Sequence, residues 1–124
     1  MCSGGQCSNC GAVGYVERHH TVFRSQASYM KFIPCNTVLL CLDCHRGSKN
    51  GVHHNKETDL KLKSQLQNEL FGMFSDKFIR GEEIQEKLKC TKIDSTLILK
   101  KLTMYRQGYE REQLVRRLLG GRLY

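Results

Sequence analysis

The chain has 124 residues, 40% of them hydrophobic, which suits a single domain with a small core. Its 20 Lys and Arg against 12 Asp and Glu give a formal net charge of +8, which favours a polyanionic partner such as nucleic acid. No apolar run approaches the ~18 residues of a membrane span, and residues 1–9 are too polar for a secretory signal. We therefore expect a cytoplasmic protein with no membrane partner.

Two short strands are predicted in the first half of the chain. Residues 13–21 end in a pair of histidines and have the composition of a strand, and the β-branched, apolar run at 36–41 predicts a second one. Residues 23–34 lack a clean period and predict a loop, and the glycine-containing stretch 47–51 predicts another. We expect residues 1–5 to be frayed.

From residue 57 onward, helical spacing dominates. Leucines recur at mostly helical intervals over 57–74, with Thr58 as a start signal. Further short helices are predicted at 81–90, from Asp94 onward and at 110–119. Two strands followed mainly by helix predict a small α+β protein.

The positive charge is concentrated in the second half. Residues 61–124 carry fourteen Lys and Arg against eight Asp and Glu, a net of +6, whereas residues 1–60 carry a net of only +2. We therefore divide the chain into a core, 1–60, and a basic helical extension, 61–124, in which residues 81–102 look like a helix-turn-helix. The extension is predicted either to grip DNA or to serve as a helical cap or dimer surface, so a homodimer stays an option.

Because no secretory signal is expected, the seven cysteines indicate a metal site rather than a disulfide framework. Four of them form two Cys-x-x-Cys pairs, Cys7 with Cys10 and Cys41 with Cys44. Four thiolates complete the closed tetrahedron of a structural Zn²⁺ site, which has no open position for chemistry. Cys35 and Cys90 are expected to be ordinary thiols. Cys2 is a less favoured alternative ligand for the structural Zn²⁺.

The five histidines all lie within 36 residues of one another. Histidine is both a neutral metal ligand and a base near neutral pH. His19 and His20 end the first predicted strand on opposite faces, so one can bind a metal while the other acts on water. His45 directly follows the last zinc cysteine. His53 follows a glycine-bearing loop that can fold back over the site.

The order His19-His20, Asn36 and His45 inside a Cys-x-x-Cys frame resembles the HNH endonuclease superfamily. The string at residues 36–47 is similar to that of small phage and mobile-element HNH proteins, and the resemblance covers roughly residues 7–60. It implies a zinc-stapled ββα-metal core, here followed by a helical C-terminal region.

The resemblance also implies roles for individual residues. His20 matches the general base that takes a proton from the attacking water, and His19 and His45 match ligands of one catalytic divalent cation. Asn36 matches the residue whose side chain orders the base-bearing loop.

One position departs from the family pattern. Many relatives place a third ligand four residues after the second, where this chain has Lys49. A third ligand must then come from His53 or His54, and we favour His53. Arg46 is placed to touch a phosphate, although such an arginine is more often simply solvated.

The leading expectation is a metal-dependent DNA endonuclease with a structural Zn²⁺ and a catalytic Mg²⁺, Mn²⁺, Ni²⁺ or Zn²⁺. The resemblance to phage and mobile-element proteins implies the cytoplasm of a bacterial host. Two alternatives stay open. One is a non-catalytic, zinc-stabilised module that binds nucleic acid, and the other is a phage assembly or regulatory protein.

Overall fold

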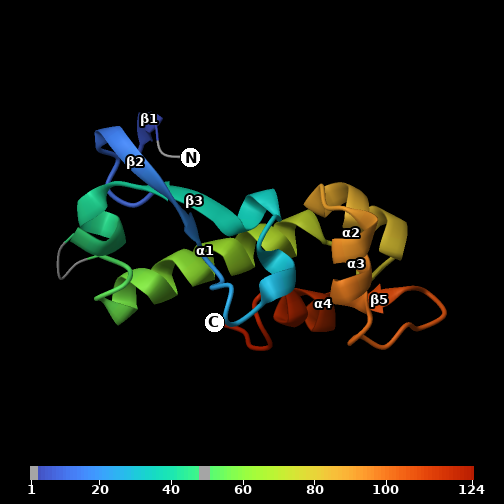
Figure 1. Ribbon diagram of the computed structural model, residues 1–124. Coiled ribbons are helices and arrows are strands. Elements are labelled where there is room, and N and C mark those ends of the chain that lie inside the picture. The colour runs from blue at the N-terminus through green and yellow to red at the C-terminus, as the bar shows by residue number, and fades with distance from the viewer. Residues whose placement is uncertain (1–2, 48–50) are drawn as a thin grey trace.

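The structure is a computed structural model that describes residues 3–47 and 51–124. A three-stranded sheet lies at one end of the molecule and three short helices lie at the other, and a long helix, α1 (Lys56–Met73), extends along both (Figure 1). The prediction of a small α+β fold is confirmed.

The sheet is antiparallel, with β2 in the middle. Its strands are β1 (Ser3–Gln6), β2 (Val13–His20) and β3 (Thr37–Leu40). The expectation that residues 1–5 are frayed is wrong for residues 3–5, which pair with β2; Cys2 lies outside the described residues. The sequence of β1 is polar and rich in glycine, so it lacks the alternation of apolar and polar residues that predicts a strand.

The register of β2 against β3 sets the geometry of the site. His19 lies opposite Val38 and His20 lies opposite Thr37. Because successive side chains alternate between faces, Glu17 and His19 share one face of β2, and Arg18 and His20 share the other. The two histidines therefore face different sides of the strand, as predicted.

The segment between β2 and β3 contains two short 3₁₀ turns, Ser28–Met30 and Pro34–Asn36. The sequence predicted that Asn36 begins the strand, but it ends the second turn, and β3 begins at Thr37. After β3, a π-type turn at Asp43–Gly47 buries Cys44 and His45. Of the loop predicted at 47–51, residues 48–50 lie outside the described residues.

Helix α1 (Lys56–Met73) begins two residues before the predicted start signal. Its N-cap is Asn55, whose Oδ1 accepts from Glu57 N at 2.9 Å and from Thr58 N at 3.2 Å. Asparagine is a better N-cap than threonine because its side chain reaches these free N–H groups readily. The helix continues through residue 60, so both predicted regions share it.

Both regions also contribute to one hydrophobic core. The larger buried cluster joins side chains from residues 22–33 with others from α1 and from residues 79–119, among them Met30, Leu70 and Leu118. A smaller cluster surrounds two of the cysteines and includes Val16, Leu40 and Leu62. The sheet end is thus held to the helical end by packing as well as by α1.

The helical end consists of α2 (Gly81–Leu88), α3 (Lys92–Leu99) and α4 (Arg111–Leu118), together with the paired short strands β4 (Phe78–Ile79) and β5 (Tyr109–Glu110). The sequence did not predict the two strands, since two residues are too short to show a period. A Cβ at Gly108 would lie 2.5 Å from the Ile79 carbonyl oxygen, so this close pairing requires glycine.

Two arginines of α4 cap other helices. Arg111 donates to the carbonyls of Phe74 and Phe71 at the end of α1, at 2.6 and 2.7 Å. Arg117 donates to the carbonyls of Ile98 and Leu97 at the end of α3, at 3.0 and 2.8 Å. These cations satisfy carbonyls that a helix terminus leaves unpaired, so they stabilise the fold and are not free to grip DNA. No helix within 3–47 and 51–124 is long and apolar enough to cross a membrane.

Candidate metal centres

The four cysteines of the two Cys-x-x-Cys pairs come together in one cluster. All four Sγ atoms lie within 4.8 Å of one another, and Cys10 Sγ lies 3.7 Å from Cys41 Sγ. A tetrahedral Zn–S₄ site with bonds of about 2.3 Å has its sulfurs about 3.8 Å apart. The cluster therefore has the dimensions to hold a structural metal ion such as zinc, and the predicted grouping is confirmed.

Neighbouring N–H groups donate hydrogen bonds to sulfur atoms of this cluster, which favours their thiolate form. Asn9 donates its backbone N–H to Cys7 Sγ at 3.4 Å and its side-chain amide to Cys44 Sγ at 3.3 Å. Burial opposes ionisation of Cys7, but backbone hydrogen bonds outweigh it and lower the pKa of that thiol to about 6. Burial and the other thiols raise the pKa of Cys44 to about 12. Ionisation of Cys44 is thus opposed by its surroundings, and a cation in the cluster would offset that opposition.

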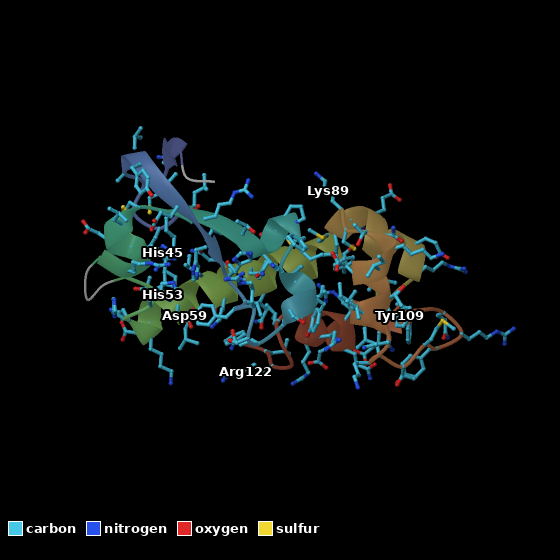
Figure 2. The ribbon with its side chains drawn as sticks, in the orientation of Figure 1. His45, His53, Asp59, Lys89, Tyr109 and Arg122 are labelled. Atoms are coloured by element: carbon cyan, nitrogen blue, oxygen red, sulfur yellow. The ribbon has the colours of Figure 1, made fainter. Side chains whose placement is uncertain are left out.

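Three histidines form a second cluster, on the face of β2 that carries His19. The ligand nitrogens of His19, His45 and His53 lie within 4.8 Å of one another. His45 Nε2 lies 3.0 Å from His53 Nε2, close to the separation of about 3.3 Å that two imidazoles have in a tetrahedral zinc site. Figure 2 shows His45 and His53 adjacent, and Asp59 of α1 is close enough to His53 for its charge to act on that ring.

The buried Nε2 of His19 is a second observation that bears on whether this cluster suits a metal ion. His19 is 3% exposed, and its Nε2 has no hydrogen-bond partner among the described residues. Burial, together with the neighbouring histidines, lowers the pKa of His19 to about 3, so the ring stays neutral. A buried polar nitrogen without a partner is costly, and a neutral imidazole with a free lone pair suits a metal ion. The cluster thus fits a bound cation.

Glu17 supports the histidine cluster, and sequence reasoning missed it. Its Oε1 lies 2.9 Å from His45 Nδ1, which turns His45 Nε2 toward the cluster. The hydrogen bond from His45 also lowers the pKa of the Glu17 carboxyl. Carboxylates behind metal-ligating histidines fix the tautomer and raise ligand basicity. The available signal was the two-residue spacing from His19, which places both side chains on one face of a strand.

Asn36 ties together the segment that follows the two histidines. Its side chain is fully buried and makes three hydrogen bonds to backbone: Oδ1 accepts from Val22 N at 2.8 Å, and Nδ2 donates to the carbonyls of Val22 and Met30 at 3.1 and 3.2 Å. His20 Nε2 lies 3.0 Å from the carbonyl of Lys31, the residue after Met30. Asn36 therefore orders the segment against which His20 rests.

His53 and His54 were the two candidates for the third metal ligand, and the structure places them differently. His53 joins the cluster, whereas His54 Nε2 lies 3.1 Å from the Arg46 carbonyl oxygen and belongs to no metal-binding group among residues 3–47 and 51–124. Lys49 lies outside the described residues. Sequence spacing could not decide between neighbouring histidines, because the choice depends on how the preceding loop turns.

A cavity of about 520 Å³ opens at the histidine cluster. His20 lines it together with the three clustered histidines, although its own side chain belongs to the opposite face of β2. Among the described residues that line it, none is acidic, and three are arginines: Arg18, Arg24 and Arg46. The cavity thus places a candidate base and three cations beside a candidate metal site.

Comparison of the chain with protein-family models, with curated proteins and with solved structures found no match. The geometry of the two clusters and their surroundings is therefore the basis for the function that follows.

Proposed function

We propose that the protein is a metal-dependent endonuclease of the HNH kind, which hydrolyses phosphodiester bonds in DNA. The observation that carries this proposal is the histidine cluster, with its unpartnered His19 nitrogen, in the same cavity as His20 and three arginines. Each part has a role that phosphodiester hydrolysis requires.

The proposed catalytic cation is held by His19, His45 and His53. Three imidazoles leave positions for water and substrate, as in other catalytic sites with three protein ligands. Imidazole ligands favour Zn²⁺ or Ni²⁺, whereas Mg²⁺ and Mn²⁺ prefer oxygen ligands. The bound cation would neutralise the charge that builds on the phosphate and on the leaving oxygen.

His20 is the proposed general base. A backbone carbonyl only accepts hydrogen bonds, so the 3.0 Å contact with the Lys31 oxygen requires the proton on Nε2. The neutral ring is then left with its lone pair on Nδ1, the nitrogen that would take the proton from water. Because this side chain is absent from the metal-binding group, it is free to act as a base.

The arginines are the proposed phosphate ligands. Arg18, Arg24 and Arg46 are exposed side chains around the cavity, with no acidic side chain among the described lining residues to neutralise them. Guanidinium groups bind phosphate oxygens through paired N–H donors. They would hold the scissile strand against the cation.

The cysteine cluster takes a structural role in this proposal. Four sulfur ligands close a zinc site, so the metal there would staple the turn after β1 to the end of β3. That staple fixes His45, the residue directly after Cys44.

Plasmid nicking tests the proposal. The purified protein is incubated with supercoiled plasmid and Mn²⁺, Ni²⁺, Zn²⁺ or Mg²⁺, and we expect relaxed circles that disappear in the His20→Ala variant, with at least about a hundredfold loss of rate. His54→Ala is the matched control, because that histidine lies outside the cavity and should retain activity. Absence of nicking with every metal, or equal nicking by His20→Ala, would contradict the proposal.

A second candidate is a non-catalytic module that binds nucleic acid. It is favoured by α2 and α3, which are joined by a tight turn with Lys89 at a positive φ of 54°. Lys92, at the start of α3, and Lys100, directly after its end, are both exposed. Salt-dependent DNA binding without nicking would select this candidate over the endonuclease.

A further inference from the structure

A second cavity, of about 560 Å³, lies beside the first. Arg18 and His20 line both, so these two side chains form a shared wall. The proposed hydrolysis takes place in the first cavity and does not require the second. Its position makes it the natural place for whatever part of a substrate extends past the proposed catalytic centre.

The β2–β3 register builds one wall of this cavity. Arg18 pairs with Leu39 and His20 pairs with Thr37, and all four side chains line the cavity. Cross-strand partners lie on the same face of a sheet, so they present one continuous surface. The opposite wall comes from the segment before β3, through Lys31 and Phe32.

Phe32 is the unusual residue of this wall. Its side chain is 73% exposed, although an aromatic ring of this size normally gains by burial. Lys31 Nζ lies 5.0 Å from the centre of the ring, so a positive charge accompanies the exposed aromatic face. Leu39, 37% exposed, adds apolar surface.

Charge identifies what this surface can bind. The described residues that line the second cavity include Arg18 and Lys31 and no acidic side chain. An exposed aromatic ring between cations is the combination with which proteins bind single-stranded nucleic acid, because the ring stacks on a base while the cations contact the backbone.

We propose that the second cavity is a nucleotide subsite, in which Phe32 stacks on an unpaired base adjoining the scissile phosphodiester. The inference rests on the proposed function, since the bound strand is the one that reaches the histidine cavity. It specifies the substrate class as single-stranded or locally unpaired DNA. In an intact duplex the faces of the bases are covered by their neighbours, so they are unavailable to the ring.

Tryptophan fluorescence tests this subsite directly. The chain contains no tryptophan, so a Phe32→Trp variant carries a single reporter at the proposed stacking position. We expect oligothymidylate of about ten nucleotides to quench its emission at low salt, with far less quenching by a duplex of equal length. Tyr105→Trp is the matched control, because Tyr105 is 41% exposed and lines neither cavity.

Affinity measurements provide the second readout. Phe32→Ala should weaken binding of the same oligothymidylate about tenfold or more, whereas Phe32→Tyr should retain it, because tyrosine also stacks. Since the side chain is largely exposed, both variants should fold. No quenching by the single strand, equal quenching by the duplex or at the control position, or unchanged affinity in Phe32→Ala would overturn the subsite.

The outcomes separate the two proposals. Quenching at Phe32→Trp in a protein that cleaves neither supercoiled plasmid nor single-stranded DNA with any metal leaves a site that binds unpaired bases and removes the endonuclease. Nicking by the wild type without quenching removes the subsite and retains the endonuclease.

Discussion

The Glu17 carboxylate lies 2.9 Å from His45 Nδ1, while the other nitrogen of the same ring lies 3.0 Å from His53 Nε2. The imidazole is thus held between a carboxylate and a second metal-ligating nitrogen. The hydrogen bond to Glu17 fixes which nitrogen of His45 carries the proton, so the lone pair is directed into the cluster before a cation arrives.

Glu17→Gln should therefore weaken cation binding at the histidine cluster. The amide retains the shape of the side chain but loses the negative charge, so we expect the dissociation constant to rise about tenfold or more. Calorimetric titration with Zn²⁺ or Ni²⁺, with the cysteine site already loaded, measures it. Glu86→Gln, an exposed position on α2, should have no effect, and an equal change in both variants would count against the role of Glu17.

Cys44→Ala should remove the metal from the cysteine cluster. Three thiols do not close the site, so we expect one zinc fewer per chain by elemental analysis and a free energy of unfolding lowered by more than about 3 kcal/mol. Cys90→Ala is the control, because this half-buried cysteine belongs to neither metal-binding group. Full zinc content in Cys44→Ala would show that the metal is held elsewhere.

Asn36→Asp should destabilise the segment on which His20 rests. The carboxylate can still accept from Val22 N, but it cannot donate to the carbonyls of Val22 and Met30. The Val22 carbonyl would lose its partner and the Met30 carbonyl would retain only Ile33 N as a donor, at a cost of about 3 kcal/mol in urea denaturation. Asn68→Asp, on the exposed side of α1, should change stability by less than about 0.5 kcal/mol. Similar midpoints for the two variants would contradict this account.

The sequence predicted the parts of the site whose spacing is local. Two Cys-x-x-Cys turns can bring four thiols together wherever their strands pair, and the expected grouping of Cys7, Cys10, Cys41 and Cys44 is confirmed. The grouping of His19 with His45 also follows from the β2–β3 pairing. The identity of the bound ions, the HNH relationship and the activity stay predictions.

Contacts that depend on the path of the chain could not be predicted. Asn9 reaches Cys44 and Glu17 reaches His45 only because the β1–β2 turn and β2 lie beside the turn after β3. Sequence spacing does not show either contact. Likewise Arg111 and Arg117 belong to a basic stretch, and composition alone cannot distinguish a helix-capping arginine from one exposed to DNA. Both the contacts of Asn9 and Glu17 and the capping role of the two arginines depend on the tertiary structure.

Tyr29 connects the segment between β2 and β3 to α4, and its removal tests whether the two regions fold together. Its hydroxyl donates to the Arg117 carbonyl at 2.6 Å, and the Arg117 guanidinium carbon lies 3.8 Å from the centre of the ring. Tyr29→Phe should lower the free energy of unfolding by about 1 kcal/mol at neutral pH, because the carbonyl loses a buried donor. A single urea transition, shifted as a whole, is the expected result.

The same variant should also alter stability in alkali. Burial raises the pKa of Tyr29 in the folded protein, despite the opposing charge of Arg117. A folded-state pKa above the unfolded value means that the contribution of the protonated phenol is complete below pH ~10 and is lost as the pH rises through the folded pKa. Wild type should therefore lose stability more steeply than Tyr29→Phe above pH ~10, whereas Tyr105→Phe, altered at an exposed tyrosine, should follow wild type. Equal alkaline slopes for wild type and Tyr29→Phe would show that folding does not raise the pKa of this phenol.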